Sequence, residues 1–281
     1  MTVKKYVANI EDLSNKKIIL TGGTSGIGKA LTFHLANKNA TILLLARNEE
    51  KINNTIKEIK EQYPNANISY HLYDQADYSS IEETVKYILK EHQDFHALIL
   101  NAGVLAGPKG GLTKDGYPLT VGVNFLGVKH FIDCIVPNLK SNHKIIIQGS
   151  IVAFGNVKKK DDLYSPKNGM FKQYNLSKIY LESYFHYWNE KYDQEFILTE
   201  PGVSATNVTQ YMNSFVRVSG KYFLKATVHS PKKACLPLLL AVSSKTKKGD
   251  YITPRGLFTI TGFPKIKKFP NRRIREHLIF D

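Results

Sequence analysis

The chain has 281 residues, of which 42% are hydrophobic and 22% are charged, and its 39 basic and 24 acidic side chains give a formal net charge of +15. This ordinary globular composition suits a large core that needs no disulfide or metal to hold it together. The two cysteines, Cys134 and Cys235, stand apart without CxxC spacing, which argues against a disulfide framework or a zinc site. We therefore expect a cytoplasmic protein with no bound metal.

The distribution of apolar and basic residues bears on membranes and nucleic acids. Residues 1–17 interrupt their apolar positions with charge, so they lack the apolar core of a signal peptide. The longest apolar stretches, residues 97–100 and 236–242, are too short to cross a bilayer. Most basic residues are scattered lysines typical of a solvated face, and only residues 265–275 combine basic and apolar side chains closely. We expect neither stable membrane insertion nor a nucleic-acid partner.

Short apolar runs alternate with helical patterns along the chain. Apolar residues at three- and four-residue spacing, such as Ile52, Ile56 and Ile59, predict helices between the runs. This repeated βαβ order predicts an α/β protein of a single domain over residues 1–281, with a mainly parallel sheet and helices on both faces. Strands are expected at residues 17–21, 41–45, 68–73, 97–100, 144–148 and 195–199, and later helices at 173–191 and 231–243.

The first predicted strand runs directly into a glycine-rich turn, TGGTSGIG, at residues 21–28. Its glycines allow a sharp turn and bring backbone N–H groups and the positive end of the next helix close to a pyrophosphate. Taken alone, the turn fits a tight connection without a ligand about equally well. The candidate cofactor-binding residues here are Gly22, Thr24, Ser25, Gly26, Ile27 and Gly28.

The end of the second strand indicates which dinucleotide would bind. A carboxylate at this position would accept a hydrogen bond from the 2′-hydroxyl of NAD, but Ala46 has none. Arg47 and Asn48 follow it, and the planar guanidinium of Arg47 suits a 2′-phosphate. NADP(H) is therefore preferred over NAD(H). The alternative is that Arg47 only solvates a loop.

Tyr174 and Lys178 stand four residues apart in a helical pattern, which places both side chains on one helix face. The ordinary pKa of a tyrosine is about 10, and a cation within about 4 to 6 Å lowers such a pKa by about 1 to 3 units. The phenol would then be a usable proton donor near neutrality. Ser150, just past a buried strand, is placed to hold a carbonyl oxygen beside it. Taken singly, the pair also fits a tyrosine packing on a lysine stem.

Together, and in this order, these motifs resemble the short-chain dehydrogenase/reductase family over nearly the whole chain. The resemblance implies a Rossmann-type, doubly wound parallel β-sheet with helices on both faces, and an enzyme acting on alcohol and carbonyl groups with NADP(H). The matching segments are the glycine turn, Asn101-Ala102-Gly103 (its NAG motif), Asn124, Ser150, Tyr174 and Lys178 (its catalytic tetrad), and Pro201-Gly202-Val203 with Thr206 (its PG…T segment).

The resemblance also implies a role for each residue of the tetrad. Tyr174 would protonate the carbonyl oxygen during hydride transfer, and Ser150 would orient the carbonyl. Lys178 would bind the nicotinamide ribose and lower the pKa of the tyrosine, while Asn124 would hold a water that links the lysine to a proton relay.

One more matched residue concerns the adenine. Asp74 corresponds to the family acid that bonds the adenine amino group. Gln75 replaces an aliphatic neighbour, which predicts a more polar adenine pocket.

Spacing points to a branch of the family. Tyr174 lies 24 positions after Ser150, about twice the usual interval in the family. With this interval, residues 46–48, 112–127 and 251–265 are similar to the branch of retinol dehydrogenases, protochlorophyllide reductases and WW-domain oxidoreductases. Two features depart from the branch. The N-terminus carries no membrane anchor of the retinol dehydrogenase kind, and Gly149 stands where the branch often has a serine.

The substrate is expected beneath two loops, at about residues 155–171 and 204–228. Their aromatic residues suggest an apolar pocket for a hydrophobic or aromatic ketone or aldehyde, although each ring fits lid packing equally well. The natural substrate, the direction of reaction and the oligomeric state stay open, homo-oligomers included. The aromatic candidates are Phe154, Tyr164, Phe171, Tyr211, Phe215, Tyr222 and Phe223.

We thus predict an NADPH-dependent enzyme that reduces a small-molecule carbonyl to an alcohol. A non-catalytic NADP(H)-binding redox sensor, an NAD-dependent alcohol dehydrogenase, and an epimerase or dehydratase of the extended branch are the alternatives. An intact tetrad argues against the sensor, which needs no proton donor.

Overall fold

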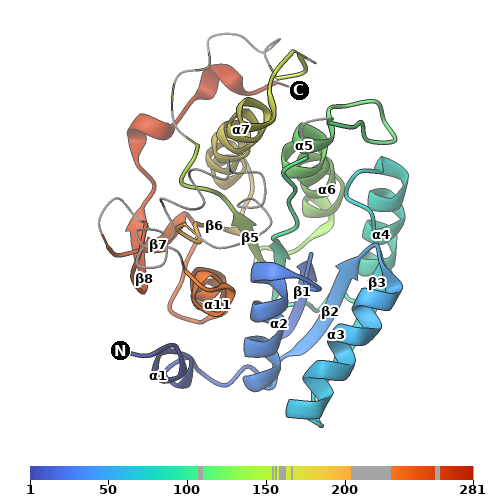
Figure 1. Ribbon diagram of the computed structural model, residues 1–281, viewed down its shortest axis with the longest axis vertical. Coiled ribbons are helices and arrows are strands. Elements are labelled where there is room, and N and C mark those ends of the chain that lie inside the picture. Colours follow the sequence, from blue (N-terminus) through green and yellow to red (C-terminus); the bar gives the residue numbers. More distant parts are fainter. Residues whose placement is uncertain are drawn as a thin grey trace, which may run out of the picture.

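The computed structural model describes residues 1–106, 110–153, 155, 157, 163–165, 167–203, 229–256 and 260–280. Eight strands form one sheet in the order β3-β2-β1-β4-β5-β6-β7-β8 (Figure 1). All neighbours pair in parallel except β7 and β8, which are antiparallel. The strands are β1 Lys17–Thr21, β2 Thr41–Ala46, β3 Ile68–Leu72, β4 Ala97–Leu100, β5 Lys144–Gln148, β6 Glu195–Thr199, β7 Asp250–Pro254 and β8 Pro264–Lys268.

Successive side chains of each central strand point to opposite faces of the sheet, and helices cover both faces. In β1, Ile18 and Leu20 pack in the core beneath α2 and α11, whereas Ile19 packs in the core beneath α4, α6 and α7. Such burial on both sides is typical of a parallel sheet and confirms the predicted doubly wound α/β fold. The main helices are α2 Gly26–Asn37, α3 Glu49–Gln62, α4 Tyr78–Glu91, α6 Gly127–Ile135, α7 Met170–Lys191 and α11 Leu236–Val242.

A nearly continuous helical stretch between β4 and β5 was not among the predicted helices. It consists of α5 Leu119–Val121, a π-helical turn at Gly122–Leu126, α6, and a 3₁₀ turn at Val136–Asn138. By length and composition, Leu119–Asn138 is apolar enough to cross a membrane, but 72% of its most apolar window is buried within the structure. Burial of that extent is typical of the core helix of a soluble protein, so the stretch is weak evidence for a span.

The C-terminal part of the chain departs most from the predicted elements. The helix expected at 231–243 is split into α10 Pro231–Ala234 and α11, because Pro237 lies in the first turn of α11 and has no N–H to continue the helix. Strands β7 and β8 were not predicted. In β8, lysines and a proline break the apolar pattern, and such residues are typical of a strand at the edge of a sheet.

The last described residues run alongside α7, as the red segment of Figure 1 shows. They form two 3₁₀ turns, Asn271–Arg273 and Glu276–Leu278. Beyond these turns, the ring of Phe280 packs against those of Phe125, Tyr180 and Tyr184. The backbone N–H of Phe280 donates to the Tyr184 hydroxyl at 2.8 Å. The basic tail seen in the sequence is thus part of the packed structure. The short helix α1 Val3–Ala8 lies near the other terminus.

The turn from β1 to α2 depends on its glycines. Gly22 and Gly26 have φ angles of 71° and 51°, in the left-handed region that favours glycine. A Cβ atom on Gly28 would lie 2.1 Å from the carbonyl oxygen of Gly22. The chain therefore folds back on itself too closely for any side chain at Gly28.

We predict that Gly28→Ala destabilises the protein by about 2 kcal/mol or more, because the clash is with backbone and cannot be relieved by a side-chain rotation. Thermal unfolding would show a midpoint lower by several degrees. Gly169→Ala is the matched control, since no atom lies within 4 Å of a Cβ placed there. Equal midpoints for the two variants would contradict the packing argument.

Candidate functional site

The sequence-predicted site residues gather at the carboxyl ends of the central strands. The strand order reverses between β1 and β4, the place where ligands bind in open α/β sheets. The glycine turn follows β1, Asn101 follows β4, Ser150 lies just past β5, and Pro201 lies just past β6. Parallel strands deliver all of these segments to one edge of the sheet.

Asn101 ties the NAG segment to the glycine turn. Its side-chain amide donates to the carbonyl oxygens of Thr21 at 3.0 Å and Gly22 at 3.4 Å. In return, the Thr21 hydroxyl accepts from the backbone N–H groups of Asn101 and Ala102, each at 3.0 Å. Asn101 therefore shapes the candidate cofactor loop, and its amide group is already engaged with the protein.

Asn124 lies in the π-helical turn, a feature frequent at functional sites. Its side-chain oxygen accepts from the N–H of Val104 at 2.7 Å, and its amide nitrogen donates to the carbonyl of Val104 at 2.8 Å. The same nitrogen lies 3.3 Å from the hydroxyl of Ser177, the residue before Lys178. Asn124 thus links the segment after β4 to the turn of α7 that carries Lys178.

The tyrosine, serine and lysine of the predicted tetrad come together. The Tyr174 hydroxyl faces the side chain of Ser150, which acts to lower the pKa of the phenol. Lys178, in the next turn of α7, is 5% exposed, and its ammonium donates to the carbonyl of Gln148 at 2.8 Å. Burial lowers the pKa of Lys178 to about 8, and the nearby Glu182 acts in the opposite direction.

The pKa of Tyr174 differs in direction from the prediction. Burial raises this pKa above its ordinary value, and Ser150 offsets only part of the rise. The predicted lowering by Lys178 is wrong for this structure, in which that ammonium bonds to Gln148. The phenol is therefore held in its protonated form near neutral pH.

Residues at the ends of β2 and β3 form the outer part of the site. The side chain of Arg47 is 64% exposed and lies 3.9 Å from Asp74, so it is free to meet an anion. Asn48 caps α3 by accepting from the N–H of Lys51 at 2.7 Å. One oxygen of Asp74 accepts from the N–H of Ala76 at 3.0 Å.

The prediction that Gln75 makes the adenine pocket polar is wrong. Its side chain is buried and donates to the carbonyls of Ala102 at 3.2 Å and Val123 at 2.6 Å. Its oxygen accepts from the hydroxyl of Tyr73. Gln75 therefore joins β3 to the NAG segment and the π-helical turn from inside the protein.

Pro201 and Gly202 form a tight turn after β6. Gly202 has a φ angle of 72°, and a Cβ atom there would lie 2.4 Å from the carbonyl oxygen of Ile260. The buried ring of His229 bridges this turn to a neighbouring loop, with Nδ1 3.2 Å from the carbonyl of Pro201 and Nε2 3.1 Å from the N–H of Gly262. Burial lowers the pKa of His229, which suits a neutral ring accepting at Nε2. Thr206 lies outside the described residues.

The predicted substrate-covering loops are described only in part. Tyr164 and Phe171 are 37% and 55% exposed, and the ring of Tyr164 lies 5.8 Å from that of Tyr117. The other aromatic candidates, Phe154, Tyr211, Phe215, Tyr222 and Phe223, lie outside the described residues.

A buried ionic cluster, not predicted from the sequence, lies behind Ser150. Glu182 of α7 and Glu200 after β6 are completely buried, and both contact Arg273 from the C-terminal segment. No motif marks these residues, because each ordinarily prefers the surface and their meeting depends on the fold. Among the described residues, no cluster of three or more His, Cys, Asp or Glu side chains is arranged to hold a metal ion.

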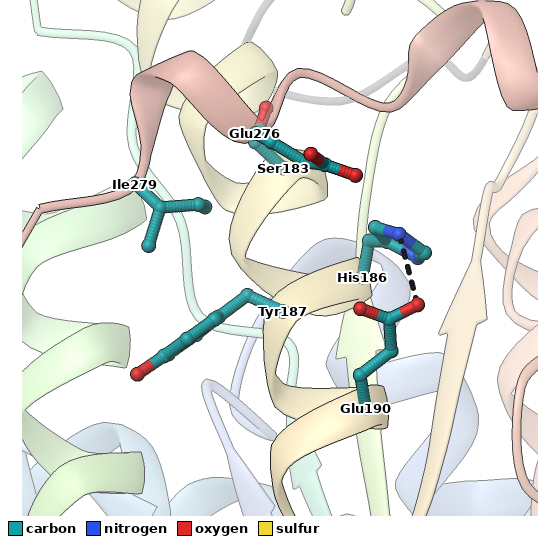
Figure 2. A pocket seen from close by; sticks show the side chains of 6 residues that line it. All are labelled: Ser183, His186, Tyr187, Glu190, Glu276 and Ile279. Atoms are coloured by element: carbon teal, nitrogen blue, oxygen red, sulfur yellow. Dashed lines mark ion pairs between the residues drawn. The ribbon is translucent and has the colours of Figure 1, made fainter.

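A cavity of about 210 Å³ lies further along α7, between this helix and the C-terminal segment (Figure 2). In it, His186 and Glu190 of α7 form an ion pair at 3.3 Å. None of the predicted site residues lines it. Its lining residues are Ser183, His186, Tyr187, Glu190, Glu276 and Ile279.

Comparison with known proteins agrees with this geometry. A family model described as short chain dehydrogenase matches residues 16–216. An uncharacterised oxidoreductase of Schizosaccharomyces pombe is 27% identical over 261 residues, which cover 86% of this chain and 76% of that protein. Human retinol dehydrogenase 13 is 31% identical over 175 residues, 61% of this chain and about half (51%) of that enzyme.

Solved structures share the fold. An alcohol dehydrogenase from the archaeon Thermococcus sibiricus, solved in complex with 5-hydroxy-NADP, superimposes with a TM-score of 0.66 at 18% sequence identity, covering 86% of this chain and 97% of that one. With the family match over most of its length and the site residues gathered at the carboxyl edge of a doubly wound sheet, the chain belongs to the short-chain dehydrogenase/reductase family of oxidoreductases and resembles its retinol dehydrogenase branch.

Proposed function

We propose that this protein is an NADP(H)-dependent oxidoreductase that reduces a hydrophobic or aromatic ketone or aldehyde to an alcohol, with Tyr174 as the proton donor. The observation that carries the proposal is the placement of the Tyr174 hydroxyl beside Ser150, one helical turn from the buried ammonium of Lys178, which bonds to Gln148. The site lies at the carboxyl edge of the sheet, beside the glycine turn.

The residues of the glycine turn suit a dinucleotide. Gly22 and Gly28 have no room for a Cβ atom against neighbouring protein atoms, which keeps the turn tight, and α2 begins directly at Gly26. Ser25 makes no side-chain cap bond to this helix, so its hydroxyl and the first N–H groups of α2 are suited to phosphate oxygens. When bound, the dinucleotide supplies the hydride.

The choice of NADP(H) rests on Arg47. Its guanidinium is exposed, and its 3.9 Å pairing with Asp74 is of the weak, solvent-screened kind that a ligand phosphate readily replaces. No carboxylate stands at Ala46 to accept from a ribose 2′-hydroxyl. That the Thermococcus relative was solved with an NADP derivative is consistent with this choice.

The protonation of Tyr174 suits the proposed reduction. Reduction needs a protonated phenol that donates to the carbonyl oxygen, whereas oxidation needs a phenolate that accepts from the alcohol. Burial raises the pKa of Tyr174, so the donor form predominates near neutral pH. Ser150 would orient the carbonyl, and the charge of Lys178 would stabilise negative charge as it develops on Tyr174.

We predict that Tyr174→Phe lowers kcat by about 10²-fold to 10⁴-fold while leaving the Kd for NADPH nearly unchanged, because only the proton donor is removed. NADPH oxidation with a panel of aromatic ketones and aldehydes measures kcat, and calorimetry measures Kd. Tyr187→Phe, further along the same helix, is the control. Turnover retained in Tyr174→Phe would end the assignment of the proton donor.

We expect Arg47→Ala to weaken NADPH binding by roughly 10-fold to 100-fold, the value of a lost charge-assisted hydrogen bond, and to leave NADH binding unchanged. Parallel calorimetry with NADPH, NADP⁺ and NADH tests this. Lys57→Ala, at an exposed position of α3, controls for the loss of positive charge. Equal losses for NADPH and NADH would remove the 2′-phosphate role. Wild-type protein that binds NADH as well as NADPH would point instead to an NAD-dependent alcohol dehydrogenase.

Lys178 gives a prediction that separates catalysis from stability. Its pKa falls from 10.5 to about 8 on folding, so the folded state disfavours the charged form. The resulting destabilisation, roughly 3 kcal/mol, is fully present below pH 8 and disappears as the pH rises from about 8 to the unfolded pKa.

Lys178→Met should therefore be inactive but at least as stable as the wild type at pH 7. Its gain in the free energy of unfolding should be at most about 3 kcal/mol, reduced by the contribution of the lost hydrogen bond to Gln148. The difference should shrink when unfolding is measured near pH 10. Lys86→Met, at an exposed position of α4, should show neither effect. A Lys178→Met variant much less stable than the wild type at pH 7 would mean that the ammonium supports the fold.

A further inference from the structure

The buried cluster of Glu182, Glu200 and Arg273 lies directly behind the catalytic groups proposed above. One guanidinium nitrogen of Arg273, Nη2, lies 2.6 Å from Oε1 and 2.5 Å from Oε2 of Glu182, and 2.9 Å from Oε1 of Glu200. The other terminal nitrogen, Nη1, donates to the Tyr251 hydroxyl of β7 at 2.8 Å. Both carboxylates are completely buried, so Arg273 joins charges that water does not reach.

Each partner of Arg273 belongs to a segment that carries part of the site. Glu182 stands one turn after Lys178 and two turns after Tyr174 in α7, which places the three on one helix face. Glu200 ends the connection from β6 and is followed directly by the Pro201-Gly202 turn.

Ser150 is held through its backbone on both sides. Its N–H acts to lower the pKa of the Glu182 carboxyl group, and its carbonyl oxygen accepts from Nη2 of Arg273 at 3.4 Å. The position of its hydroxyl, which faces Tyr174, therefore depends on the cluster.

Gly149 makes room for this arrangement. A Cβ atom at this position would lie 3.3 Å from Oε1 of Glu182 and 3.2 Å from the side chain of Leu198. A serine there would crowd the buried carboxylate. Glycine at position 149 thus fits the close approach of Glu182 and Leu198.

The charges of the cluster depend on one another. Burial lowers the pKa of Arg273, but Glu182 and Glu200 raise it by more, so the guanidinium stays charged. Burial also raises the pKa of Glu182, and Arg273 opposes this rise. The pKa of Glu182 stays well above its ordinary value even with Arg273 in place, so loss of the guanidinium would raise it further and change the contacts that this carboxyl group makes.

We propose that Arg273 is a positioning residue for carbonyl reduction. Through Glu182, Glu200 and the carbonyl of Ser150, it holds the serine, the tyrosine–lysine face of α7 and the Pro201-Gly202 turn in one arrangement. The inference rests on the proposed function, because it assigns Arg273 a role in that same site.

The residues after Arg273 extend the same contact. Nη2 of Arg275 donates to the carbonyl of Gly155 at 3.1 Å, and Nε2 of His277 lies 3.0 Å from the carbonyl of Val157. The C-terminal segment thus also contacts the backbone of the loop that follows Ser150, at Gly155 and Val157. Arg273 is the member of this segment that reaches the ionic cluster.

The test compares Arg273→Met, Arg273→Lys and Arg273→Ala with Lys268→Met, an exposed lysine of β8 that controls for lost charge. We expect Arg273→Met to lower kcat by about 10²-fold, the effect of a misplacement of about 1 Å, and to change the KM for NADPH by less than about threefold. Arg273→Lys should recover little, because an ammonium does not reproduce the planar fork that meets both carboxylates. Lys268→Met should behave as the wild type.

Chemical rescue separates positioning from loss of folding. Guanidinium ion at millimolar concentration should restore part of the kcat of Arg273→Ala by occupying the vacated site between the two carboxylates, and it should not activate Lys268→Met. If Arg273→Ala does not fold, Glu200→Gln keeps the shape of the cluster and should lower kcat without changing the Kd for NADPH. Wild-type kcat in a folded Arg273→Met or in Glu200→Gln would overturn the proposal.

Amide hydrogen exchange distinguishes a failure of this inference from a failure of the proposed function. If the wild type reduces no aromatic ketone or aldehyde of the panel, the proposed function fails. Positioning is then judged by exchange at residues 148–153, which should be at least about tenfold faster in Arg273→Met than in Lys268→Met, while exchange in β2 stays unchanged. Equal exchange at residues 148–153 in the two variants would overturn the positioning role.

Discussion

Burial of the central strands on both faces is the constraint on which the rest of this structure depends. Ile18, Ile19 and Leu20 of β1 are all fully buried, and β4 and β5 are buried along their whole lengths. Because apolar packing covers both faces of such a sheet, polar side chains that could contact a ligand are accessible only at the ends of the strands. Because the strands are parallel, those ends meet at one edge, and the glycine turn, Asn101 and Ser150 meet there.

The polar residues at that edge hold one another in place. Asn101 and Thr21 bond reciprocally, and Asn124 bonds both ways to the backbone of Val104. Most of their hydrogen-bonding groups are therefore committed to the protein, which leaves Tyr174, Ser150 and the exposed Arg47 as the groups best placed to meet ligands. A site built in this way is preorganised before anything binds, and preorganisation is what electrostatic catalysis requires.

This preorganisation opposes stability where charges are buried. Lys178 is held as an ammonium in surroundings that lower its pKa to about 8, and Glu182 and Glu200 lie where water does not reach. Such groups are retained in a fold only when other groups compensate them. For the two glutamates the compensation comes from Arg273, far away in the sequence, and for Lys178 it comes from the carbonyl of Gln148. The contacts of Arg273 join the C-terminal segment to α7.

The sequence by itself determined the features that arise from local pattern. The strands from β1 to β6, the glycine turn, and the shared helix face of Tyr174 and Lys178 all follow from spacing within a few residues. Only the tertiary structure determined which groups the buried polar side chains contact. Gln75 faces inward to the carbonyls of Ala102 and Val123, and Lys178 bonds to Gln148, which leaves the pKa of Tyr174 under the control of burial. The ionic cluster of Arg273 belongs to the same class, because burial and pairing depend on residues that meet only when the sheet has closed and the C-terminal segment has packed against α7.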